Sequence, residues 1–169
     1  MPITAFIALG SNLGDRRGAI ERAVEALRGA ERVKVVRLSP VIETAPVGGP
    51  VGQGAFLNAA CELQSSLDPR QLLDLLLAVE ATMGRERRVR WGPRPIDLDL
   101  LLFGDRIIHE PGLRLPHPRM HERLFVLEPL AMIAPNAVHP VLRLTIAALL
   151  RHARAEAVRL ASGCRHNPA

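Results

Sequence analysis

The order of strand-like and helix-like segments limits the folds available to this chain more than any other feature of its sequence. Short apolar or alternating segments are typical of strands, whereas apolar residues that recur every three or four positions between capping residues indicate helices. The segments are a strand at Ile3–Leu9, a helix between Asp15 and Gly29, strands at Val33–Thr44 and Phe56–Leu67, a helix between Asp68 and Gly84, and a strand at Ile96–Phe103. This β-α-β-β-α-β order is that of the ferredoxin-like motif and predicts an α+β sandwich.

The second helix has the clearest boundaries. Asp68 can cap its start, Pro69 suits the first helical position, and Gln71 can complete a capping box with the aspartate. Gly84 can end it. These signals favour a helix independently of its apolar pattern.

The last third of the chain is expected to complete the same domain. Two Pro-rich turns and two helical stretches, at about 119–133 and 145–159, would cover one side of the sheet. With 169 residues, 48% of them hydrophobic, the chain is long enough for one buried core and short for two. We therefore expect a single domain at residues 1–161, a ferredoxin-like core with additional C-terminal helices, and a frayed tail at 162–169.

Composition excludes several classes of protein. Lys34 is the only lysine, so the GxxxxGK[ST] phosphate loop cannot be present. No segment reaches the roughly 18 apolar residues that a membrane span requires. Cys61 and Cys164 lack the spacing of a metal or redox site, and the apolar start at 2–10 lacks the pattern of a secretory signal. We expect a reduced, cytoplasmic protein.

The formal net charge of +5 is concentrated in one short segment. Residues 85–94 contain one acid, Glu86, and the arginines Arg85, Arg87, Arg88, Arg90 and Arg94. Guanidinium groups bind phosphate oxygens in pairs and stay charged. A solvated run of charge is the usual role of such a segment, but its position directly before two aspartates favours polyphosphate binding.

These aspartates form the sharpest chemical pattern in the sequence. In a strand, Asp97 and Asp99 project from the same face, about 7 Å apart. Two carboxylates at this spacing suit one or two hard cations, and magnesium takes its remaining ligands from water and substrate phosphates. A polar outer strand face is the alternative, but Leu101 and Phe103 would continue that face as apolar residues. The pattern therefore indicates a metal–nucleotide site.

Aromatic residues are few, and three of them lie near these segments. Phe56 and Trp91 flank a glycine-rich loop at 47–55 and the arginine-rich loop, and Phe125 follows the Pro-rich turn at 116–118. If Phe56 and Phe125 converge, they could hold a flat heterocycle between them. From the residues alone, packing in the core is the preferred interpretation of both rings.

Several ordered motifs resemble those of the 6-hydroxymethyl-7,8-dihydropterin pyrophosphokinase family. The resemblance runs from Ile7 to about Pro140. Its motifs are ALGSNLG at 8–14, ETAPVG at 43–48, FLNA at 56–59, RWGPRPIDLDLL at 90–101, LPHP at 115–118 and HERLFV at 121–126. Their number and order over most of the chain make the resemblance highly specific.

The resemblance implies a monomeric enzyme that transfers pyrophosphate from ATP to the hydroxymethyl group of the pterin and releases AMP, a step of tetrahydrofolate biosynthesis. Two magnesium ions would be held by Asp97 and Asp99, and the catalytic residues would be these two with Arg85 and Arg94. The implied pterin site comprises Thr44, Ala45, Pro46, Val47, Phe56, Asn58 and Phe125. The residues implied to contact ATP, or to order the loops over it, are Glu80, Arg85, Arg87, Arg90, Trp91, Arg94, His117 and Arg123.

A single-stranded RNA-binding module is the alternative from another class of protein, because RRM domains share the same order of elements. Such a module would need an aromatic RNP-like strand, which the sequence lacks. In addition, Asp97 and Asp99 would repel a phosphate backbone unless they bound a metal. We therefore expect ATP and a pterin as partners, with neither nucleic acid nor a membrane.

Overall fold

The computed structural model describes residues 1–49, 51–84 and 95–163, and its sheet has the ferredoxin-like strand order. The elements of this core are β1 (Ile3–Ser11), α1 (Arg16–Arg28), β2 (Val33–Leu38), β3 (Ile42–Thr44), β4 (Phe56–Ser65), α2 (Pro69–Thr82) and β5 (Asp97–Phe103). The strands follow the order β2-β4-β1-β5, with β3 also pairing with β4, and every pairing is antiparallel. The predicted α+β architecture is confirmed.

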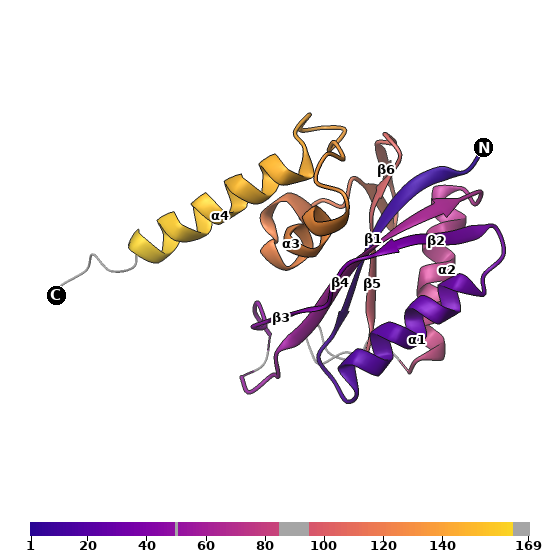
Figure 1. Cartoon of the computed structure of the whole chain (residues 1–169), viewed down its shortest axis with the longest axis horizontal. Helices are drawn as coiled ribbons and strands as arrows, with labels where there is room; N and C mark the ends of the chain where they lie inside the picture. Colours follow the sequence, from indigo (N-terminus) through magenta and orange to yellow (C-terminus); the bar gives the residue numbers. More distant parts are fainter. Residues whose placement is uncertain (50, 85–94, 164–169) are drawn as a thin grey trace.

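The sheet separates two layers of helices (Figure 1). Helices α1 and α2 lie on one face, and α3 (Leu124–Ile133) with α4 (Ile146–Gly163) lies on the other. Successive side chains of β1 point to opposite faces of the sheet and enter both hydrophobic clusters. Ile7 and Leu9 join the buried cluster that includes Ile20 of α1, whereas Phe6 joins the cluster that includes Leu127 of α3. The central strand is therefore buried on both faces.

The predicted strand at Val33–Thr44 is interrupted. It forms β2 and β3, which are separated at residues 39–41. Pro40 has no N–H to donate to a strand ladder. The buried Ser39 bridges the gap, since its backbone N–H donates to the Ala60 carbonyl at 2.9 Å and its hydroxyl accepts from the Ala60 N–H, also at 2.9 Å. The chain then re-enters the sheet with Thr44 opposite Phe56.

A bulge in β5 interrupts the alternation of side chains that was expected along this strand. Phe6 pairs with Leu102 and Ile7 with Leu100, so Leu101 is an extra residue. Leu101 and Leu102 both join the cluster under α3, and Phe103 joins the opposite cluster. The prediction that Phe103 shares a face with the aspartates is therefore wrong, because strict alternation ends at the bulge.

The last third differs from its prediction in three details. A hairpin of β6 (Ile108–Glu110) and β7 (Leu113–Leu115) precedes the helices. The helical stretch expected at 119–133 is divided into a short 3-10 helix, η1 (Met120–Glu122), and α3. Helix α4 continues through Gly163, so the first two residues of the predicted frayed tail are helical. In the described part of the chain, no helix is long and apolar enough to span a membrane.

The capping box of α2 generates a stability prediction. The Asp68 carboxylate accepts from the Gln71 N–H at 2.8 Å, and the Gln71 side chain accepts from the Asp68 N–H at 3.0 Å. Asp68→Ala should lower the free energy of unfolding by about 1 kcal/mol, because the first helical turn loses a hydrogen-bond acceptor. Chemical denaturation measures this loss. Asp74→Ala, an exposed position within the same helix, is the matched control; equal losses in both variants would contradict the capping role.

Candidate active site

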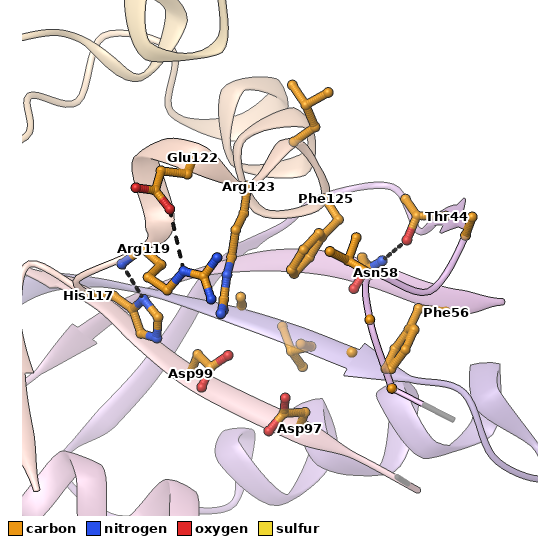
Figure 2. A pocket seen from close by; sticks show the side chains of 18 of the residues that line it. Thr44, Phe56, Asn58, Asp97, Asp99, His117, Arg119, Glu122, Arg123 and Phe125 are labelled. Carbon is orange, nitrogen blue, oxygen red and sulfur yellow. Dashed lines mark hydrogen bonds and ion pairs between the residues drawn. The ribbon is translucent and has the colours of Figure 1, made fainter. Parts of the chain in front are cut away.

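A cavity of about 730 Å³ lies where the end of β1 meets the start of β5. Its walls come from these two strands, from the β3–β4 connection, and from the segment between β7 and α3 (Figure 2). Segments that are distant in sequence therefore meet at one end of the sheet.

The β3–β4 side of the cavity presents a fixed amide. Asn58 is 5% exposed, and its Nδ2 donates to the Thr44 hydroxyl at 2.6 Å. Gly10 lies beside it on β1, and a Cβ added to Gly10 would lie 3.1 Å from the Asn58 Oδ1. This spacing is tighter than an ordinary contact, so the absence of a side chain at position 10 leaves the amide in place. The result is an oriented polar edge suited to a planar ligand.

Two aromatic rings face the same cavity. Phe56 comes from β4 and Phe125 from α3, and both are half-buried (Figure 2). Phe125 also packs against the buried cluster under α3, so the core-packing interpretation holds for it in part. The expected convergence on one cavity is observed, whereas the stacking of a heterocycle between the rings stays a prediction.

Carboxylates and arginines occupy the other side of the cavity. Asp97 and Asp99 both line it from β5, and Arg119 and Arg123 line it from the segment before α3. The Arg123 guanidinium carbon lies 5.6 Å from the centre of the Phe125 ring. Burial lowers the pKa of Arg123, and Asp99 opposes this shift, but a guanidinium stays protonated in proteins.

A metal at this site would need ligands beyond those that the described residues supply. Among residues 1–49, 51–84 and 95–163, no group of three or more His, Cys, Asp or Glu side chains could hold a metal ion. Asp97 and Asp99 supply two hard oxygen donors, and magnesium commonly takes its other ligands from water and substrate phosphates. The donor set therefore fits magnesium bound together with a phosphate-bearing substrate.

His117 enters the cavity wall as a neutral side chain. Its Nδ1 accepts from the Arg119 N–H at 3.3 Å, which leaves Nε2 as the protonated nitrogen of the neutral ring. Burial, followed by the charge of Arg123, lowers its pKa from 6.5 to about 4. At neutral pH the imidazole can therefore donate a hydrogen bond without carrying a charge.

Glu80 supports the strand that carries the aspartates. It is in α2, is 2% exposed, and its Oε1 accepts from the backbone N–H of Leu98 at 2.7 Å. Leu98 lies between Asp97 and Asp99 on β5, at the end of the strand order of the described sheet. Glu80 is not among the residues that line the cavity, so its implied contact with ATP stays a prediction.

Most of the predicted site residues that the structure describes lie around the cavity. Those that line the cavity are Thr44, Ala45, Val47, Phe56, Asn58, Asp97, Asp99, His117, Arg123 and Phe125. Pro46 is next to lining residues but does not line the cavity itself. The predicted roles of Arg85, Arg87, Arg90, Trp91 and Arg94 fall outside the described residues.

Nine residues that line the cavity were not predicted as site residues: Ala8, Leu9, Gly10, Gly48, Gly49, Gln53, Arg119, Glu122 and Leu124. Gly10 lies in the ALGSNLG motif at 8–14, which was a signal for it. Arg119 is two residues from His117, and its Nε lies 3.4 Å from the Glu122 carboxylate. That ion pair depends on the 3-10 turn of η1, which sequence spacing did not indicate.

Fold and site together define a ferredoxin-like domain suited to a flat, polar heterocycle beside an anionic group. The sequence model of the 7,8-dihydro-6-hydroxymethylpterin-pyrophosphokinase (HPPK) family matches residues 6–135. The chain belongs to this family, which confirms the predicted family and the enzyme class, pyrophosphokinase.

Relatives of known name support this assignment, and a solved structure matches the fold. The chain is 51% identical over 129 residues to the 2-amino-4-hydroxy-6-hydroxymethyldihydropteridine pyrophosphokinase of Bacillus subtilis, covering 76% of this chain and 77% of that one. Identity to the Pseudomonas aeruginosa protein of the same name is 44% over 131 residues, covering 78% and 80%. A crystal structure of wild-type Plasmodium falciparum HPPK-DHPS, 16% identical, matches the fold with a TM-score of 0.69 over 90% of this chain and 45% of that longer chain.

The contact between Glu80 and Leu98 predicts a difference between two substitutions. Glu80→Leu should lower the free energy of unfolding by about 1–3 kcal/mol, because the Leu98 N–H loses its acceptor in a buried place. Glu80→Gln keeps an acceptor oxygen and should lose less. Urea denaturation of both variants compares them, and amide hydrogen exchange at Leu98 reports the local effect. Equal stability of the two variants would show that this hydrogen bond contributes little.

The depressed pKa of His117 predicts a pH dependence. In the metal-free protein, the ring signals of His117 should titrate at about pH 4 in NMR spectra. Because the unfolded chain binds this proton at about pH 6.5, stability should fall as the pH decreases from about 6.5 to about 4. His117→Gln should reduce that slope in denaturation measured across the same pH range. A titration midpoint near 6.5 would contradict the effect of burial.

Proposed function

We propose that the protein transfers pyrophosphate from ATP to the hydroxymethyl group of 6-hydroxymethyl-7,8-dihydropterin and releases AMP, as a step of tetrahydrofolate biosynthesis. The observation that carries this proposal is the division of one cavity into two halves. Asn58, Thr44 and the rings of Phe56 and Phe125 line one half, and Asp97 and Asp99 with nearby arginines line the other. Family membership supports the same reaction.

The first half would bind the pterin. The hydrogen bond from the Asn58 Nδ2 to Thr44 orients the amide, and its Oδ1 can accept from an N–H group at the edge of the heterocycle. Phe56 and Phe125 would contact the faces of the ring system. Backbone groups at 45–47 would complete the edge contacts. This arrangement would direct the hydroxymethyl group toward the second half.

The second half would bind the phosphates of ATP. Asp97 and Asp99 would hold two magnesium ions, which when bound would neutralise charge on the phosphate oxygens. Arg123 would pair with a phosphate oxygen, and the neutral His117 would donate a hydrogen bond from Nε2. Catalytic roles of Arg85 and Arg94, and ATP contacts of Arg87, Arg90 and Trp91, are inferred from the resemblance alone.

The reaction needs positioning and charge stabilisation more than covalent chemistry. The hydroxymethyl oxygen would attack the β-phosphorus of ATP and lose its proton. The bond from that phosphorus to the oxygen bridging the α- and β-phosphates would break, and AMP would leave with this oxygen. Holding the attacking oxygen in line with the bond that breaks is the main contribution expected of the protein.

The monomeric state and cytoplasmic location stay predictions.

The RNA-binding alternative finds less support. An RRM stacks bases on exposed aromatic residues of its sheet. Here the sheet face that carries Phe6 and Leu101 is packed against α3, and Phe6 is 8% exposed. Helix α3 therefore covers this part of the face, which argues against the RRM mode of binding.

A product assay tests the proposed function. Protein, magnesium, ATP and 6-hydroxymethyl-7,8-dihydropterin should yield AMP and the pyrophosphorylated pterin, resolved by chromatography. Asp97→Asn and Asp99→Asn should each lower kcat roughly 100-fold or more, as when a single group that stabilises transition-state charge is removed. Both variants should still bind the pterin.

Asp74→Asn, on the exposed side of α2, is the control and should leave the rate unchanged. ADP as the product would indicate a simple kinase, and full activity of both aspartate variants would contradict the metal-binding role.

A further inference from the structure

Arg16 contacts both ends of the loop that closes one side of the cavity. The Arg16 Nη2 lies 3.0 Å from the Glu43 Oε2, and its Nη1 donates to the Ala55 carbonyl at 2.8 Å. Glu43 lies in β3, and Ala55 directly precedes β4. Arg16 is the first residue of α1, so the helix fixes the backbone from which its side chain extends. The two branches of one side chain therefore connect the chain before the loop with the chain after it.

The loop between these contacts contributes directly to the cavity. Val47, Gly48 and Gln53 lie in it and line the cavity. The residues next to the two contacts are Thr44 and Phe56, which pair across the β3–β4 ladder. A displacement of either end of the loop would move a side chain of the candidate pterin site.

The local backbone gives the loop little rigidity of its own. Strand β3 has three residues, so few ladder hydrogen bonds hold it against β4. Gly48, Gly49 and Gly52 have positive φ values, which glycine adopts at no steric cost but with a large loss of conformational freedom on ordering. The Asn12 side chain also contacts this region, with its Nδ2 3.5 Å from the Gly54 carbonyl, which is long for a hydrogen bond. The two contacts of Arg16, at 2.8 and 3.0 Å, are shorter than this one.

We propose that Arg16 is a positioning residue for the pterin half of the cavity. Arg16 does not line the cavity, so it acts through Glu43 and Ala55. A lone exposed ion pair is worth little, and Glu43 is 59% exposed. The guanidinium, however, binds the carboxylate and the carbonyl at once, which a lysine ammonium on a flexible stem does less well. We call the two contacts of Arg16, with Glu43 and Ala55, the clamp. The effect on pterin binding rests on the proposed function, whereas the clamp itself does not depend on any substrate.

Two measurements on the full chain test the proposal. In Arg16→Gln, amide hydrogen exchange over 42–49 and 51–58 should become faster in the absence of ligands. The KM for the pterin should rise about tenfold, the effect of losing one charge-assisted hydrogen bond, with kcat and the affinity for ATP unchanged. Arg16→Lys should have an intermediate KM, and Glu43→Gln a smaller effect than Arg16→Gln, because the contact with Ala55 remains.

Arg28→Gln is the matched control. Arg28 is also on α1 and pairs with Glu25, far along the helix from the loop. It should change neither exchange in the loop nor any kinetic constant. Unchanged exchange in Arg16→Gln would overturn the clamp, and faster exchange with an unchanged KM for the pterin would overturn its positioning role. A wild-type protein that forms no AMP would instead refute the proposed function, while the exchange experiment would still decide whether the clamp exists.

Discussion

The pairing of β1 with β4 on one side and β5 on the other is the constraint on which the rest of the structure depends. Gly10 is paired with Asn58 in one direction and with Asp97 in the other. Residues directly opposite in antiparallel strands share a face of the sheet. One register therefore brings together the amide of one half of the cavity and a carboxylate of the other. The two helical layers hold this register, because β1 is buried on both faces.

Much of the fold could be predicted because local sequence carries its signals. The order of elements, the Asp68 cap and the apolar face of α1 follow from patterns within a few residues of one another. The failures have a common physical origin. The way in which the chain continues past Pro40 depends on how Ser39 bonds to β4, and the bulge at Leu101 depends on the partner strand. Neither contact is visible in the sequence of the strand that it alters.

The candidate site shows the same division. Ordered motifs identified about half of the residues that line the cavity, including Asp97, Asn58 and Phe125. The contacts that position those side chains were harder to predict, because the partners are distant in sequence and often backbone atoms. Glu80 bonds to the amide of Leu98, and Arg16 bonds to the carbonyl of Ala55. A motif records which side chains meet a substrate and says little about what holds them.

The row Asn58–Gly10–Asp97 also sets a length scale for recognition. Neighbouring strands are about 4.8 Å apart, so the side chains of the outer two positions are rooted roughly 10 Å apart on the backbone. Hydrogen bonds between strands, rather than flexible side chains, fix this separation. The sheet thus fixes the distance between the group that would orient the heterocycle and the group that would face the phosphates. The backbone would then set the preference of the site for a substrate of a given length. Substitutions of cavity side chains would change this preference little.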